Sequence, residues 1–487
     1  MSRGGILYRQ FLDNLGYEAT PSQDRFFTAF SDFLTSDEGD IFVLNGYAGT
    51  GKTTAVASVV NTMRELQIAT VLLAPTGRSA KVLASYAGNR AYTIHKHIYR
   101  QKSHGDDGFG QFSLAPNKAK TTLFIVDEAS LMGIESGGGA STASFGSGNL
   151  LGDLVEFVRR GTDCRLLLVG DSAQLPPVGL DASPALSVEY MAQIGGVRFE
   201  TLTEVVRQEK ASGILYNATR IRGLLEGGFA EVEIPRDELR LEVEPFDDIE
   251  RISGGELLET LSDAYGKYGE EETIVLCRSN KRANRYNAGI RAQVLFKEER
   301  LVRGDRLMIV KNCYQFVEDL PELDYIANGD MASLVKISHF EDRYGLHFAD
   351  AVLSFPDYDD VEVDAKVLLD TLESESATIT YEQSNALYQG VSADYSHIRS
   401  KKKRYDAVRE DPYYNALQLK YAEAITCHKS QGGQWDCVFI DNPFWQDTLT
   451  TDDLKWLYTA ITRGVKKVYL INFKDELFGL ADAKNRV

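Results

Sequence analysis

The chain has 487 residues, 43% of them hydrophobic and 25% charged, and its formal net charge is −18 at pH 7. This length predicts about three domains, and the composition is that of a folded globular protein, which excludes a largely disordered chain. The negative charge excludes a uniformly basic nucleic-acid-binding surface, although a narrow cleft lined by lysine, arginine and backbone N–H groups could still bind a single strand.

Targeting and metal-binding signals are absent from the sequence. No apolar run approaches the roughly 18 residues that a membrane-spanning helix needs, and the first residues, MSRGGILYRQFLDNLGYEA, lack the apolar core of a signal peptide. The five cysteines form no C-x-x-C pair, which indicates neither a zinc site nor a disulfide framework. We expect a cytoplasmic protein with reduced thiols and no membrane contact.

Short apolar runs alternate with amphipathic segments from residue 20 onward. Strands are predicted at 41–45, 69–74, 122–128 and 164–171, with a helix at 53–67. A second series of strands is predicted at 273–279, 436–441 and 467–473. Alternation of this kind is typical of helices packed around a parallel sheet, so two α/β cores are expected.

Three segments interrupt this alternation. Residues 98–121 predict a β-hairpin around the turn HGDDGFG. Residues 303–415 contain β-like pieces (DRLMIVKN, MASLVKI and GLHFADAVLSF) and the basic run KKKR at 401–404, and predict a small barrel inserted into the second core. Residues 133–149, GIESGGGASTASFGSGN, are so rich in glycine and serine that a mobile loop is expected.

A nucleotide site is predicted at GYAGTGKT, residues 46–53, which fits G-x-x-x-x-G-K-[ST] between a strand and a helix. The backbone N–H groups of Gly49 to Thr53 would hold the phosphates, and Lys52 would neutralise the β- and γ-phosphate charge. Mg²⁺ would bind the Thr53 hydroxyl and, through water, Asp127 in the segment IVDEAS. Glu128 would orient or deprotonate the attacking water.

Further motifs follow in a fixed order along the chain: APTGRSAK (74–81), TIHK (93–96), VDEAS, LVGDSAQLPPV (168–178), LTEVVRQ (202–208), AITCHKSQGGQWDCVFID (424–441) and YTAITRG (458–464). Together with the phosphate loop, they resemble superfamily 1 helicases, and most closely the RecD-like branch that includes the phage Dda helicase. The similarity runs from about residue 20 to residue 472. It implies ATP and Mg²⁺ as cofactors.

The resemblance implies roles for further residues around the nucleotide. Gln23 would contact adenine, Gln174 would sense the γ-phosphate, and Arg207 and Arg463 would act as arginine fingers, although a polar helix residue and surface ion pairs are the ordinary alternatives. Gln434 stands where the family has an acid that holds the ribose, so nucleotide selectivity stays open. The complete expected nucleotide site is Gln23, Gly46, Ala48, Gly49, Thr50, Gly51, Lys52, Thr53, Thr54 and Gln434.

A nucleic-acid groove is implied across both cores. Its expected contacts are Pro75, Thr76, Arg78, Thr93 and His95 from the first core, and Thr426, His428, Lys429 and Ser430 from the second. Both histidines could instead be buried core residues. The 98–121 hairpin resembles a strand-separating pin with Phe109 or Phe112 at the junction, although packing is the commoner role of such aromatics. KKKR could contact phosphate or form a solvated face.

The resulting prediction is an α/β protein with two RecA-like P-loop NTPase domains, at 1–97 with 122–205 and at 206–302 with 416–487. The hairpin at 98–121 is inserted in the first, and an SH3-like β-barrel at 303–415 in the second. The expected activity is that of an ATP-dependent DNA helicase moving 5′ to 3′ on single-stranded DNA. The alternatives are an RNA helicase, or an ATP-regulated DNA-binding switch without unwinding.

The expected partners are single-stranded DNA and junctions between single- and double-stranded DNA. Single-strand-binding, replication and repair proteins are candidate protein partners, with roles in DNA repair and recombination. A monomer is the expected state.

Overall fold

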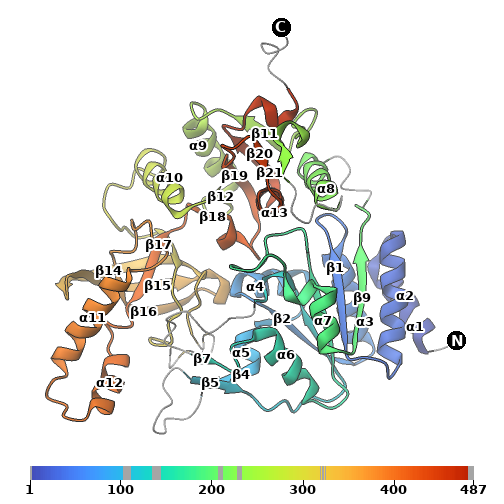
Figure 1. The fold of residues 1–487 in the computed structure, drawn as a ribbon, viewed down its shortest axis with the longest axis horizontal. Coiled ribbons are helices and arrows are strands. Elements are labelled where there is room, and N and C mark those ends of the chain that lie inside the picture. Colours follow the sequence, from blue (N-terminus) through green and yellow to red (C-terminus); the bar gives the residue numbers. More distant parts are fainter. Residues whose placement is uncertain are drawn as a thin grey trace.

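The computed structural model describes residues 3–101, 111–133, 144–206, 212–226, 233–317, 320, 323 and 325–480. Within these ranges the chain forms two parallel sheets, a closed barrel and two small sheets (Figure 1). The predicted α/β organisation and the barrel are therefore confirmed. No helix in the described ranges is both long and apolar enough to cross a bilayer.

The first sheet has six strands in the order β3-β2-β6-β8-β1-β9, and all its pairings are parallel. Every residue of β6 is buried, as expected for a strand covered on both faces. The strands are β1 (Ile41–Gly46), β2 (Ala69–Ala74), β3 (Ala91–Thr93), β6 (Thr122–Val126), β8 (Arg165–Gly170) and β9 (Val197–Leu202).

Helices surround this sheet, and α2 is the one that carries Gln23. It starts at Pro21 because Thr20 and Gln23 form a reciprocal capping box, and its rings Phe26, Phe30 and Phe33 pack on Phe42 of β1. The helices are α1 (Arg3–Leu15), α2 (Pro21–Thr35), α3 (Lys52–Glu65), α4 (Gly77–Ala87), α5 (Ile94–Ile98), α6 (Leu150–Arg159) and α7 (Val188–Ile194).

The second sheet has five strands in the order β11-β21-β19-β12-β18, again with parallel pairings. Its strands are β11 (Ile249–Ile252), β12 (Thr273–Cys277), β18 (Ala424–Thr426), β19 (Trp435–Asp441) and β21 (Gly464–Ile471). Its helices are α8 (Gly213–Glu226), α9 (Leu257–Tyr268), α10 (Asn280–Gln293) and α13 (Thr451–Ile461). A two-stranded sheet, β10 (Ile234–Pro235) with β20 (Thr448–Leu449), lies beside it.

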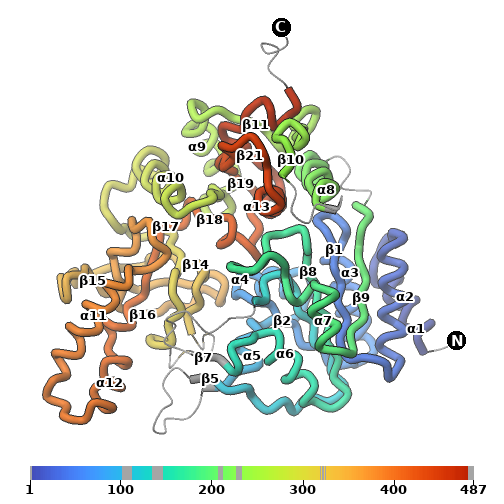
Figure 2. Tube along the Cα trace, viewed as in Figure 1, coloured from blue at the N-terminus to red at the C-terminus, as the bar shows by residue number. Residues whose placement is uncertain are grey.

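The barrel consists of β13 (Arg306–Ile309), β14 (Met331–Arg343), β15 (Leu346–Phe355), β16 (Val361–Leu368) and β17 (Leu417–Tyr421). Helices α11 (Tyr381–Asp394) and α12 (Lys401–Arg409) form an arm between β16 and β17, and KKKR is the first turn of α12. Figure 2 shows the chain leaving the second core after α10 and returning through β17 to β18. The closing strand β17 lies beyond residue 415, inside the range expected for the second core.

The predicted hairpin is present as β4 (Tyr99–Gln101) paired antiparallel with β5 (Gln111–Leu114). Its expected tip, with Phe109, lies outside the described residues, as do residues 134–143 of the glycine- and serine-rich segment. Residues 144–145 of that segment form β7 (Ser144–Phe145), which adds to β5 in parallel. This pairing joins segments distant in sequence, which local composition does not reveal.

Candidate active site and nucleic-acid groove

The phosphate loop connects β1 to α3 through a backbone that requires glycine. Gly49 and Gly51 have φ angles of +71° and +79°, in the left-handed region that glycine adopts without strain. A Cβ atom on Gly46 would lie 2.5 Å from Lys52 Cγ. The glycines therefore allow the Lys52 side chain to lie back across the loop.

Lys52 lies at the centre of this loop. Its Nζ atom donates to the carbonyls of Gly46 and, at 3.0 Å, Tyr47, and it lies 3.6 Å from Asp171 Oδ2. The hydroxyl of Thr54 donates to Gly51 O at 2.9 Å, and Thr53 is exposed in the first turn of α3. The start of a helix offers unpaired N–H groups and a positive dipole end, which favour an anion here.

Asp127 and Glu128 follow β6 directly. Asp127 Oδ1 accepts the Glu128 N–H at 2.8 Å, and Oδ2 accepts the Tyr86 hydroxyl at 2.5 Å. Glu128 has a φ of +55°, an uncommon value for a non-glycine residue. Burial raises the pKa of Glu128, while the charge of Arg463 opposes this shift.

A hydroxyl at Thr53 and a carboxylate at Asp127 fit Mg²⁺, which prefers hard oxygen ligands. The described ranges contain no group of three or more His, Cys, Asp or Glu side chains suited to a metal ion. Mg²⁺ that is held mainly by nucleotide phosphates needs only one or two protein ligands. Thr53 and Asp127 would therefore be sufficient as the protein ligands of Mg²⁺.

Arg463 reaches this site from the second core. Its Nη1 atom lies 3.9 Å from Glu128 Oε1 and donates to Gly433 O at 3.0 Å. Only 3% of its side chain is exposed. The structure thus brings the predicted arginine finger opposite the predicted catalytic carboxylate, whereas Arg207 lies outside the described residues.

Gln174 and Gln23 both lie near the phosphate loop. Gln174 lines a small cavity of about 70 Å³ with Ser130, Asp171 and Lys455, and its Oε1 has no hydrogen-bond partner among the described residues. Gln23 is fully buried and donates through Nε2 to Thr50 O at 3.3 Å. The contact of Gln23 with adenine stays a prediction.

Three of the expected groove residues of the first core, Pro75, Thr76 and Arg78, lie at the start of α4, which meets the second core. Gly432 has a φ of +74°, and a Cβ atom there would lie 2.1 Å from Ser79 Oγ. The Ser79 N–H is bonded to Thr76 Oγ1, which caps α4, and Pro75 immediately precedes this cap. Only glycine allows this approach between the HKSQG segment and the start of α4.

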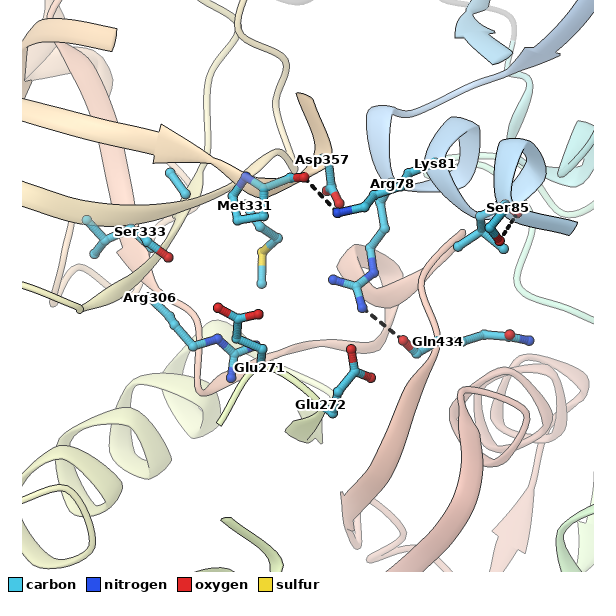
Figure 3. A pocket seen from close by; sticks show the side chains of 14 residues that line it. Arg78, Lys81, Ser85, Glu271, Glu272, Arg306, Met331, Ser333, Asp357 and Gln434 are labelled. Atoms are coloured by element: carbon cyan, nitrogen blue, oxygen red, sulfur yellow. Dashed lines mark hydrogen bonds between the residues drawn. The ribbon is translucent and has the colours of Figure 1, made fainter. Parts of the chain in front are cut away.

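Arg78 lies between three parts of the molecule (Figure 3). Its guanidinium stacks 4.2 Å from the centre of the Trp435 ring and donates to Gln434 O at 2.8 Å. The cavity beside it, about 280 Å³, is also lined by Glu271 and Glu272 of the second core and by Arg306, Ser333 and Asp357 of the barrel segment. The expected strand contact Arg78 and the expected ribose contact Gln434 therefore lie together.

The predicted groove residues of the second core are Thr426 and three residues of the short 3₁₀ helix that follows it, Cys427–Ser430. Lys429 donates to Asn328 Oδ1 at 2.5 Å, and burial lowers the pKa of Lys429 to about 8. Burial also lowers the pKa of His428, and Ser430 donates to Cys427 O at 2.7 Å. The Lys429 charge therefore lies where the second core meets the segment leading into the barrel.

His95 lies in a chain of aromatic rings that joins the hairpin to the barrel segment. Phe112 is 5.2 Å from Tyr314, Tyr314 is 5.3 Å from Tyr325, and Tyr325 is 6.1 Å from His95, between ring centres. Burial lowers the pKa of His95 to about 4, so this ring is neutral at pH 7. Thr93, just before it, caps α5 by accepting the Lys96 N–H.

Sequence reasoning missed three polar residues of the site: Tyr86, Asp171 and Tyr458. Asp171 directly follows the buried strand β8 and Tyr458 begins YTAITRG, so both stood in motifs that were recognised without a role being given to them. Tyr86 had no such signal, because its contact with Asp127 depends on how α4 packs beside the sheet.

Comparison with known proteins identifies two family models along the chain. Residues 21–224 match the model of an AAA domain, and residues 421–471 match a UvrD-like helicase C-terminal domain. The chain is 35% identical over 188 residues to the ATP-dependent RecD2 DNA helicase of Deinococcus radiodurans, covering 38% of the chain and 22% of that protein. It is 22% identical over 464 residues to the ATP-dependent DNA helicase dda of Enterobacteria phage T4, covering 88% of the chain and 93% of that protein.

A crystal structure of Pif1 helicase from Bacteroides in complex with ADP-AlF3 and ssDNA aligns over 95% of this chain and 94% of that one, with 16% identity and a TM-score of 0.46. The chain spans about a fifth of the length of the RecD2 protein and nearly all of the phage protein. On the two family models, these relatives and the ordered motifs, the chain belongs to the superfamily 1 helicases of the RecD and Dda type.

Proposed function

We propose that this protein is an ATP-dependent DNA helicase that moves 5′ to 3′ along single-stranded DNA and separates the duplex ahead of it. The observation that carries the proposal is the nucleotide cleft, where Arg463 of the second core lies 3.9 Å from Glu128 of the first. Because both cores supply residues to one site, ATP binding and release would change how the cores are held together. The polarity rests on the family resemblance.

The roles within the cleft follow from charge and position. Lys52 neutralises phosphate charge, Glu128 accepts a proton from the attacking water, and Arg463 stabilises charge that develops on the γ-phosphoryl group. Thr53 and Asp127 would hold Mg²⁺, which supplies further neutralisation of the phosphates when bound. Gln174, next to Asp171, is the proposed sensor of the γ-phosphate.

The arrangement of the two sheets supports assigning both as RecA-like domains, with a hairpin inserted in the first and an SH3-like barrel in the second. The ring contacts from Phe112 to Tyr314 and Tyr325 support a barrel that braces the hairpin against the load of strand separation. Phe109 and Phe112 are the proposed residues at the junction.

The single strand would cross the tops of both cores. Thr76 and Arg78 at the start of α4 lie close to the HKSQG segment, whose Lys429 supplies a second positive charge. Hydroxyl, amide and cationic contacts to phosphates carry no base code, which suits a translocating enzyme. These contacts by themselves do not select the sugar, so an RNA helicase is the alternative to be tested.

The test is single-turnover strand separation on matched DNA duplexes that carry either a 5′ or a 3′ single-stranded tail. ATP-dependent separation of the 5′-tailed duplex alone is the expected result, and Lys52→Ala is the blank. Separation from the 3′ tail alone would contradict the polarity while keeping the helicase. DNA-stimulated ATP turnover without separation of either duplex would favour an ATP-regulated binding switch, and stimulation by RNA alone would favour an RNA helicase.

A further inference from the structure

Tyr458 of α13 joins the second core directly to the phosphate loop of the first. Its hydroxyl accepts the Ala48 N–H at 2.8 Å and donates to Asp171 Oδ2 at 2.7 Å. The side chain is only 1% exposed. An N–H group can only donate, so the hydroxyl proton is directed at Asp171. Burial raises the pKa of Tyr458 well above its ordinary value, so the proton stays in place at neutral pH.

The next residue of α13 makes a second attachment to the first core. Thr459 Oγ1 accepts the Leu175 N–H at 2.8 Å, one residue after Gln174. The Nε atom of Arg463 donates to the Thr459 carbonyl at 3.2 Å. Hydrogen bonds at Tyr458 and Thr459 therefore connect α13 to the first core, and Arg463 is hydrogen-bonded to Thr459.

The Ala48 N–H belongs to the loop that would hold the nucleotide phosphates, and it immediately precedes Gly49. A backbone N–H has a single proton to donate, so a phosphate oxygen and the Tyr458 hydroxyl compete for it. Resting on the helicase function proposed above, we propose that Tyr458 is a positioning residue that couples phosphate binding to the placement of Arg463. Phosphate displaces the hydroxyl from Ala48, and α13 transmits this change to Arg463.

The test is Tyr458→Phe, which removes the hydroxyl and keeps the ring. A fluorescent non-hydrolysable ATP analogue is expected to bind about 3- to 10-fold more tightly, since one competing hydrogen bond is lost. The kcat of ATP hydrolysis is expected to fall about 10-fold or more, because α13 no longer positions Arg463 in the nucleotide cleft. A purely structural role would lower kcat and thermal stability without tightening nucleotide binding.

Two further variants serve as controls. Tyr286→Phe removes a hydroxyl that donates to Asp441 at 2.7 Å within the second core, and both readouts are expected to stay unchanged. Thr459→Val removes the hydrogen bond from the Leu175 N–H and leaves the Tyr458 hydroxyl in place, so kcat should fall while nucleotide affinity stays the same. Analogue binding to Tyr458→Phe no tighter than to wild type would overturn the proposal, as would equally tight binding to Thr459→Val. The binding readout remains decisive even if the wild-type protein separates no strands.

Discussion

At the scale of single residues, Arg463 is the side chain on which the catalytic interpretation depends most. We expect Arg463→Ala to lower the kcat of DNA-stimulated ATP hydrolysis by about 10³-fold or more, as removal of an arginine finger does. Arg463→Lys should not restore it, because the planar fork is lost. Phosphate release at saturating single-stranded DNA measures this. The control is Arg278→Ala, which breaks ion pairs with Asp452 and Asp453 at the other end of α13. A decrease in kcat of less than about 3-fold in Arg463→Ala would reject the arginine-finger role.

Glu128 determines the expected pH dependence. Burial raises the pKa of Glu128 above that of an ordinary glutamate, which is about 4.3. The Glu128 carboxylate therefore becomes protonated at a higher pH than an ordinary glutamate does. As the base must be ionised, kcat should fall as pH decreases, with an acid limb above that ordinary value. A pH series of kcat checks this, with Glu128→Gln expected to bind nucleotide but not hydrolyse it. An acid limb at or below the ordinary glutamate value would contradict the assignment.

At the scale of elements, the contact between the hairpin and the barrel segment is expected to affect unwinding without affecting ATP hydrolysis. Phe112→Ala removes the ring that packs on Tyr314. A ring pair of this kind contributes about 0.5–1.5 kcal/mol, so the unwinding rate should fall about 2- to 10-fold while DNA-stimulated ATP hydrolysis stays near wild type. The control is Phe340→Ala, an exposed ring on β14. Equal losses of unwinding and ATP hydrolysis would show that Phe112 has only a packing role.

At the scale of the whole molecule, the formal charge of −18 is expected to restrict the proposed nucleic-acid binding to a narrow strip. Arg78 and Lys429 are the cations expected there, so few counterions are released on binding. Each phosphate neutralised contributes about −0.7 to the slope of log K, the association constant, against log salt concentration. For so few cations the total slope should lie between about −1 and −3. Fluorescence anisotropy of a labelled single strand measures the slope. A slope steeper than about −6 would indicate a broad basic surface instead.

The parts of this protein that are built from neighbouring residues could be predicted before the fold was known. The phosphate loop, its strand and its helix are contiguous, and the glycines at 49 and 51 meet a backbone requirement that is purely local. The strands before Asp127 and Asp171 were likewise evident as apolar runs. The ordered motifs were sufficient to indicate the family, which the comparisons confirm.

Contacts between residues distant along the chain became evident only in three dimensions. Arg463 opposite Glu128, Tyr458 on the Ala48 N–H and Tyr86 on Asp127 join segments that no local pattern connects. The same holds for β17, which completes the barrel by pairing with β13 and β16 across the long α11–α12 arm. Local patterns report which face of an element is buried, whereas partners across a domain interface are selected by packing and hydrogen-bond geometry in three dimensions.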